Sequence, residues 1–164
     1  MKKTVVVYGS TTGTCDGIAQ TIASKLGVEA IEVSVMSADT IAENEVLVLG
    51  TSTWGAGELQ DDWYDGVETL KGADLSGKTV ALFGCGDSSS YCDTFCDGIG
   101  IIYEAVVGAG ATVVGAVSTD GYSFDESVAV VDGQFVGLAL DNDNEEDQTE
   151  GRIDAWIESI KPAL

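Results

Sequence analysis

Short apolar runs recur along the chain, each four to six residues long. In most of them Val and Leu follow one another directly, without the alternation of a half-exposed strand. Continuous runs of this kind are typical of strands that helices cover on both faces. We therefore predict buried strands at Thr4–Tyr8, Ala30–Val33, Glu45–Gly50, Thr79–Phe83 and Thr112–Val117.

Between these runs, apolar residues recur at helical spacing. The stripes are Ile18, Ile22 and Leu26; then Ile101, Ile102, Ala105 and Val106; then Ile153, Trp156, Ile157 and Ile160. Strands that alternate with helices in this way form an open parallel sheet with helices on both faces. The sequence therefore predicts one doubly wound α/β domain over residues 1–164.

The segment Ser118–Leu140 interrupts this alternation. It holds two short apolar runs around Asp132-Gly133, a dipeptide typical of hairpin turns. We predict that the segment leaves the last strand and precedes the C-terminal helix. The acidic run Asp141–Asp147 that follows is predicted to be a solvent-exposed connection.

Three loops of unusual composition follow the first, third and fourth predicted strands. They are Ser10–Cys15, then TSTWGAGELQDDW from Thr51, then GCGDSSSYCDTFCD from Gly84. All three are rich in glycine and hydroxyl side chains. Because ligands of open α/β sheets bind beyond the carboxyl ends of the strands, we expect these loops to surround one ligand.

The loop Ser10–Cys15 has donors that suit a phosphate group. It lies where a helix is predicted to begin, so backbone N–H groups are available, and four hydroxyls add to them: Ser10, Thr11, Thr12 and Thr14. It contains neither G-K-[ST] nor G-x-G-x-x-G, and it has no Lys or Arg. The simpler alternative is a helix N-cap with surplus hydroxyl side chains.

Two aromatic residues lie among glycines and serines at the expected mouth of the ligand site. Trp54 precedes Gly55-Ala56-Gly57, and Tyr91 follows three serines. Such positions suit stacking on a flat ring, although either residue alone could belong to the core. Trp63 and Trp156 have helical spacing among apolar neighbours and are predicted to be core residues.

The charge is strongly unbalanced, with 28 acidic and 7 basic residues, no histidine and a net charge of −21. Such a surface repels nucleic acid and anionic membranes and attracts basic proteins, although it could serve solubility alone. We find no run of about 18 apolar residues and no signal sequence. We therefore expect a cytoplasmic protein with reduced thiols at Cys15, Cys85, Cys92 and Cys96.

Four stretches follow one another in order over nearly the whole chain: GSTTGT, TSTWGAGELQDDW, GCGDSSSYCDTFCD and VDGQFVGLALDNDNEEDQTEGRIDAWI. Together they resemble the flavodoxins, specifically the long-chain branch. The resemblance implies a five-stranded sheet of order 2-1-3-4-5, with Ser118–Leu140 as an insertion in the last strand. It also implies non-covalently bound FMN and single-electron transfer between redox enzymes through the low-potential semiquinone/hydroquinone couple.

The resemblance assigns a role to each loop. The first would hold the FMN phosphate, Trp54 and Tyr91 would sandwich the isoalloxazine, and the backbones of Thr53–Gly57 and Cys85–Asp87 would meet its polar edge. Phe95 and Cys96 would close the pocket. The implied cofactor-binding residues are Ser10, Thr11, Thr12, Gly13, Thr14, Cys15, Ser52, Thr53, Trp54, Gly55, Ala56, Gly57, Cys85, Gly86, Asp87, Tyr91, Asp93, Phe95 and Cys96.

One residue departs from the family pattern. Cys15 stands where flavodoxins usually have Thr, and a thiol is a weaker hydrogen-bond donor than a hydroxyl. One hydrogen bond to the phosphate could therefore be lost or replaced by one from the backbone. The departure bears on the affinity for FMN.

An electron carrier needs no catalytic acid or base, and a chain without histidine is poorly equipped for either role. We predict no catalytic residue, no metal and, from the resemblance, a monomer. Acidic residues near the loops would lower the second reduction potential and steer basic reductases and acceptors into transient contact. They are Glu58, Asp61, Asp62, Asp65, Asp87, Asp93 and Asp97.

Three alternatives have different requirements. An FMN-dependent NAD(P)H or quinone reductase of the same fold would need an open ring face, which Tyr91 should cover. A receiver domain would need acidic residues after strand one and an Asp after strand three, where this chain has Ser10 and Thr53. A metal or iron–sulfur site at Cys85, Cys92 and Cys96 would lack any C-x-x-C pair, and the alternative is thiols that line the flavin pocket.

Overall fold

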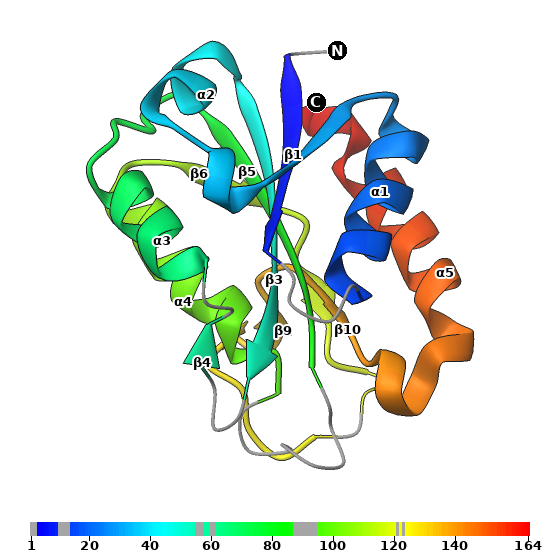
Figure 1. Cartoon of the computed structure of the whole chain (residues 1–164). Coiled ribbons are helices and arrows are strands. Elements are labelled where there is room, and N and C mark those ends of the chain that lie inside the picture. The colour runs from blue at the N-terminus through cyan, green and yellow to red at the C-terminus, as the bar shows by residue number, and fades with distance from the viewer. Residues whose placement is uncertain are drawn as a thin grey trace.

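A parallel β-sheet runs through the middle of the structure (Figure 1). The computed structural model describes residues 3–9, 14–54, 58–59, 62–86, 95–120, 122 and 124–164, and of residues 14, 52–54, 58–59 and 142–144 only the backbone. The main strands are β1 (Thr4–Gly9), β2 (Glu29–Glu32), β3 (Val46–Trp54), β5 (Thr79–Cys85) and β10 (Leu138–Leu140). They are parallel and lie in the order β2-β1-β3-β5-β10, which confirms the predicted order 2-1-3-4-5.

Two separate segments share the last strand position of the sheet. β6 (Thr112–Val114) pairs with the first residues of β5, and β10 pairs with its last residues. Between β6 and β10 the chain leaves the sheet over residues 115–137, which we call the excursion. Gly115 has a φ of 87°, and a Cβ there would lie 2.5 Å from Nε1 of Trp156, so a side chain is excluded. The prediction that this strand continues to Val117 is therefore wrong.

The excursion has its own small antiparallel sheet. β9 (Gln134–Phe135) pairs with both β7 (Val117–Ser118) and β8 (Val130–Val131). The turn between β8 and β9 has positive φ at Asp132 and Gly133, which confirms the predicted hairpin. The predicted segment Ser118–Leu140 overlaps the excursion, but its last three residues form β10 of the main sheet.

Helices cover both faces of the main sheet (Figure 1). One face packs against α1 (Thr14–Leu26) and α5 (Asn142–Ile160), and the other against α3 (Trp63–Lys71) and α4 (Asp97–Gly108). The short segments are β4 (Glu58–Leu59), α2 (Ala38–Glu43), η1 (Val33–Val35) and η2 (Lys161–Ala163). None of the helices in the described part of the chain is long and apolar enough to cross a membrane.

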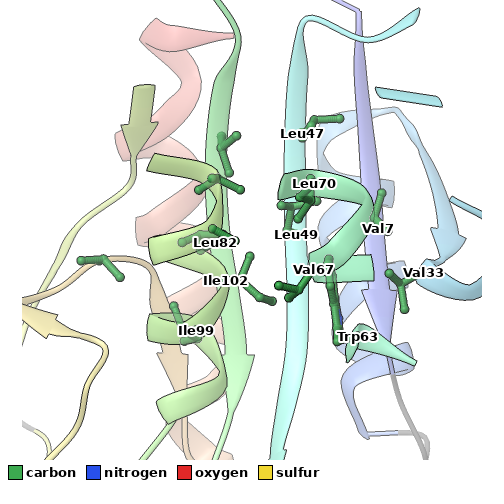
Figure 2. Close-up of a cluster of buried hydrophobic side chains, with 14 of the residues drawn as sticks. Val7, Val33, Leu47, Leu49, Trp63, Val67, Leu70, Leu82, Ile99 and Ile102 are labelled. Atoms are coloured by element: carbon green, nitrogen blue, oxygen red, sulfur yellow. The ribbon is translucent and has the colours of Figure 1, made fainter. Parts of the chain in front are cut away.

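Alternate residues of each central strand point to opposite faces and so enter two separate cores. In β3, Leu47 and Leu49 pack toward α3 and α4, and Val48 packs toward α1 and α5. Figure 2 shows the first core, where Trp63 lies beside the strands. Trp63 and Trp156 are both buried, as predicted. The continuous apolar runs are thus explained by two helical layers.

The acidic run that we predicted to be a solvent-exposed connection is helical instead. α5 begins at Asn142, and its backbone leaves helical geometry only at Glu145. Asp141, directly before the helix, is buried, and its carbonyl oxygen accepts a 2.7 Å hydrogen bond from the N–H of Glu145. The prediction failed because the run has no apolar period, whereas acidic residues favour the first turn of a helix.

Candidate functional site

The ends of three neighbouring strands meet at one edge of the sheet. Gly9 at the end of β1 is paired with Thr51 of β3, and Ser52 of β3 is paired with Cys85 at the end of β5. The three glycine- and hydroxyl-rich loops therefore leave the sheet side by side. This is the edge at which doubly wound proteins bind their ligands.

About half of the predicted cofactor-binding residues belong to the described part of the chain. They are Thr14, Cys15, Ser52, Thr53, Trp54, Cys85, Gly86, Phe95 and Cys96, and all lie at this edge or directly after it. The others lie outside the described residues: Ser10, Thr11, Thr12, Gly13, Gly55, Ala56, Gly57, Asp87, Tyr91 and Asp93.

The first loop ends where α1 begins, at Thr14. Cys15 in the first turn is fully buried, and its thiol is hydrogen-bonded to the thiol of Cys85. This hydrogen bond and burial raise the pKa of the Cys15 thiol well above its usual range. Cys15 is therefore a neutral core residue that joins α1 to the end of β5.

The second loop is framed by an antiparallel pair of strands. β3 continues four residues beyond the predicted Gly50, because Thr53 pairs with Leu59 and Trp54 with Glu58 of β4. Polar residues in Thr51–Trp54 concealed this strand from a search for apolar runs. The pairing fixes the backbone on both sides of residues 55–57.

The two ends of the third loop lie against each other. Gly86 donates a 2.9 Å backbone hydrogen bond to the carbonyl oxygen of Leu140, and a Cβ on Gly86 would lie 2.8 Å from the backbone nitrogen of Cys96. The fully buried Cys96 thiol lies 3.8 Å from the same Leu140 oxygen. The loop of residues 87–94 thus starts and ends at one point of the sheet edge.

A cluster of aromatic rings, of which Phe95 and Phe135 are fully buried, packs this point against the excursion. The ring of Phe95 is fully buried and stacks on Phe124 at 5.6 Å between centroids, with Phe135 at 5.9 Å and Tyr122 at 6.1 Å. The Tyr122 hydroxyl donates a 2.7 Å hydrogen bond to the carbonyl oxygen of Ala139. The sequence pattern gave no sign of this cluster, because its members lie far apart and have no common period.

The acidic residues around the site differ in burial. Asp62 and Asp65 are exposed at the start of α3. Asp97 is buried instead, and burial raises its pKa, although the hydrogen bond that it accepts from the backbone N–H of Val128 opposes the shift. It therefore belongs to the internal structure of the site, and not to the exposed negative surface with which we grouped it.

The lysines of the described residues lie at the opposite end of the molecule, whereas Arg152 lies over the ring of Tyr122 in the excursion. Every lysine in the described part of the chain directly precedes a strand or lies in or just after the last turn of a helix, far from the loops: Lys3, Lys25, Lys71, Lys78 and Lys161. Lysines at helix C-termini also suit the helix dipole. The charge of the molecule is thus polarised along the strands, with the site at the more negative end.

The cysteines in the part of the chain that the structure describes do not form a metal site. No group of three or more His, Cys, Asp or Glu residues there has an arrangement that could hold a metal ion. Cys92, the third cysteine of the alternative that we considered, lies outside the described residues.

The fold and the edge site define a doubly wound α/β protein that holds its ligand at the carboxyl ends of its strands. Sequence comparison then gives the family: the family model described as Flavodoxin matches residues 6–156. The chain is also 42% identical to a flavodoxin of Synechocystis sp., over 100% of this chain and 99% of the relative. It belongs to the flavodoxin family.

Further relatives agree with this assignment. The chain is 40% identical to flavodoxin 1 of Azotobacter vinelandii, over 96% of this chain and 94% of the relative. Among solved structures it is similar to the Fusobacterium nucleatum flavodoxin bound to flavin mononucleotide. That similarity has a TM-score of 0.94 and 35% identity, over 100% of this chain and 99% of the other.

Proposed function

We propose that this protein is a one-electron carrier that binds FMN non-covalently at the sheet edge and shuttles electrons between redox enzymes. The observation that carries the proposal is the convergence of three loop-bearing strand ends, β1, β3 and β5, in a chain of the flavodoxin family. When bound, FMN supplies the redox chemistry, and the chain supplies position and electrostatics.

The described residues fit such a group. The first turn of α1 presents backbone N–H groups beside the end of β1, where a phosphate would be bound by neutral donors and would keep its charge. The β3–β4 pair holds the backbone that would face the polar edge of the flavin. Cys15 is directed into the core against Cys85, so we assign its contribution to packing and leave phosphate binding to backbone N–H groups and the other loop residues.

We propose that the acidic surface lowers the second reduction potential of the bound flavin. Asp62 and Asp65 lie at the site end, and the lysines of the described residues lie at the other. A unit charge about 10 Å away contributes roughly 0.4 kcal/mol in water before screening. Several such charges beside an uncompensated phosphate disfavour the addition of a further negative charge.

The same polarity indicates how partners approach. We infer transient association with basic reductases and acceptors at the site end, by a monomer in the cytoplasm. Attraction by a net charge of −21 accelerates encounter without a large interface.

The cofactor test is a visible spectrum of the purified protein followed by mass spectrometry of the released molecule. We expect a flavin spectrum and the mass of FMN, because the site offers a phosphate loop. FAD at full occupancy, or no flavin after reconstitution, would contradict the proposal. Steady-state turnover of a quinone with NAD(P)H would instead support a reductase of the same fold.

A further inference from the structure

Tyr64 presents an exposed aromatic ring at the start of α3. It is the second residue of the helix and is 52% exposed. The other exposed large apolar residues in the described part of the chain are valines: Val35, Val107, Val128 and Val131. A single exposed valine is ordinary, whereas tyrosine is enriched where proteins bind one another. The ring is therefore a candidate contact with a partner.

The backbone that carries Tyr64 is held firmly against the sheet. Trp63, directly before it, is fully buried, and its indole N–H donates a 2.7 Å hydrogen bond to the carbonyl oxygen of Gly50 in β3. A Cβ on Gly66 would lie 2.5 Å from a side-chain carbon of Val33, so this turn of α3 is closely packed. Because the backbone is already ordered, a partner that binds Tyr64 has to fix only its side chain.

The ring lies at the end of the molecule that carries the candidate site. Only residues 60–62 separate α3 from β4, and Leu59 of β4 pairs with Thr53 beside the second loop. A protein that contacts Tyr64 therefore also lies close to the edge of the sheet at which we propose that electrons leave.

The charges nearest to Tyr64 along α3 are negative. Asp62 and Asp65 are exposed on either side of it in the sequence, and Glu68 follows one helical turn later. Lys71 comes a further turn on and forms a 3.7 Å ion pair with Glu68. The face of an aromatic ring attracts a cation, and carboxylates nearby add to that attraction. An arginine or lysine side chain thus suits this surface better than an apolar one.

The same charges disfavour other occupants of this surface. A second copy of the chain, with its own net charge of −21, would bring like charges together. Anionic membranes and nucleic acid are repelled for the same reason. A basic protein is attracted.

We propose that Tyr64 anchors basic redox partners, through contact of its ring with an arginine or lysine side chain of the partner between Asp62 and Asp65. This rests on the proposed function in one respect, namely that the basic partner is a redox protein. The carboxylates determine how fast the partner arrives, and the ring determines how long it stays.

The test is an NMR titration of the isotope-labelled protein with oxidised cytochrome c as the basic partner. Line shapes give the dissociation constant and the dissociation rate. Tyr64→Leu keeps the net charge and an apolar side chain but lacks an aromatic face. We expect it to bind about three- to tenfold more weakly, with a dissociation rate raised by the same factor and an unchanged association rate.

Two control variants define what the ring contributes. Tyr64→Phe keeps the aromatic face and should bind within about twofold of the wild type. Val107→Ala removes exposed apolar atoms from the last turn of α4 and should change neither the dissociation constant nor the rates. Wild-type dissociation rates in Tyr64→Leu, or slower association without faster dissociation, would overturn the inference. Self-association in sedimentation velocity that Tyr64→Leu abolishes would assign the ring to a second copy and would overturn it too.

The anchor and the proposed function can fail separately, because the titration measures binding without electron transfer. If the protein carried no flavin but Tyr64→Leu dissociated faster from cytochrome c, the proposed function would be refuted and the anchor supported. If the protein transferred electrons through FMN while Tyr64→Leu dissociated at the wild-type rate, the proposed function would stand and the anchor would be refuted.

Discussion

At the scale of single residues, burial determines what the thiols beside the site can do. Cys15 and Cys96 are fully buried, and burial contributes to raising the pKa of both thiols well above the usual range. The thiolate is the reactive form, so both residues are held in their unreactive state. They act as packing groups at the ends of the first and third loops.

We expect Cys15 and Cys96 to resist alkylation by iodoacetamide at pH 8 in the folded protein and to react rapidly in guanidinium chloride. Peptide mass spectrometry assigns the modification to each cysteine, so reaction at Cys92 does not confuse the result. Cys85 serves as an internal comparison, because it is slightly more exposed, at 8%. Modification of Cys15 in the folded protein at the rate of a free thiol would contradict this view of the core.

The raised pKa of Asp97 leads to a second prediction at this scale, which concerns the pH dependence of the free energy of unfolding. Its pKa is raised in the folded protein, chiefly by burial and also by the charge of Glu126, so the folded state binds the proton more tightly than the unfolded chain. Ionised Asp97 therefore lowers the free energy of unfolding at neutral pH. This cost disappears as pH falls through the folded pKa toward the ordinary value of 3.8.

The measurement compares urea unfolding of the wild type and Asp97→Asn from pH 7 to pH 4. We expect the stability of Asp97→Asn relative to the wild type to be highest at pH 7 and to decline as pH falls. Asp39→Asn, at an exposed position in the first turn of α2, is the control for loss of an acidic charge. A stability difference that is independent of pH, or that grows on acidification, would show that the pKa of Asp97 is not raised in the folded protein.

At the scale of secondary-structure elements, the apolar pattern of the sequence predicted those strands and helices whose formation depends on packing against the core. The central strands β1, β3 and β5 and the helices α1, α4 and α5 follow from apolar runs and stripes, because each packs against a continuous core. The prediction of a buried strand at Ala30–Val33 is wrong as to burial, because β2 lies at the edge of the sheet and its end residues, Glu29 and Glu32, are exposed. The strand residues up to Trp54 could not be found in this way, since pairing with β4 and not burial of apolar residues makes them a strand.

The candidate site, too, was predictable only in part from the sequence. The three loops are identifiable from composition and from their places after strands. The hydrogen bond from the N–H of Val128 to the Asp97 carboxylate was not predictable, because it joins residues 31 positions apart and no local pattern encodes that distance. The interruption of the last strand likewise depends on a contact between Gly115 and the distant Trp156.

The contribution of Gly115, where the last strand is interrupted, can be tested by substitution. We expect Gly115→Ala to lower the free energy of unfolding by about 2–4 kcal/mol, because the residue has positive φ and its Cβ would overlap the Trp156 ring. Gly133→Ala is the matched control: its φ is 81°, yet nothing lies within 4 Å of its Cβ position, so it should lose only about 1 kcal/mol. Equal losses in chemical denaturation would show that the contact with Trp156 contributes nothing.

At the scale of the whole molecule, we expect the uneven charge to orient the protein toward the basic partners that we propose, as well as to attract them. The parallel strands β1, β2, β3, β5 and β10 of the main sheet place the loops at one end and the helix C-termini, with their lysines, at the other. A basic partner is therefore drawn to the end where an electron would leave. Net charge alone would accelerate encounters at any face, whereas polarity favours the productive one.

Two variants of equal net charge distinguish these effects. Asp62→Asn/Asp65→Asn removes two exposed charges at the site end, and Glu43→Gln/Glu45→Gln removes two exposed charges at the opposite end. With a basic electron acceptor such as cytochrome c, we expect the first variant to slow the second-order rate about two- to fourfold at low salt and the second variant to slow it less. Stopped-flow rates over a range of ionic strength measure this, and the difference should vanish as salt screens the charges. Equal slowing by both variants would mean that net charge and not polarity governs association, and rates that do not depend on salt would refute steering altogether.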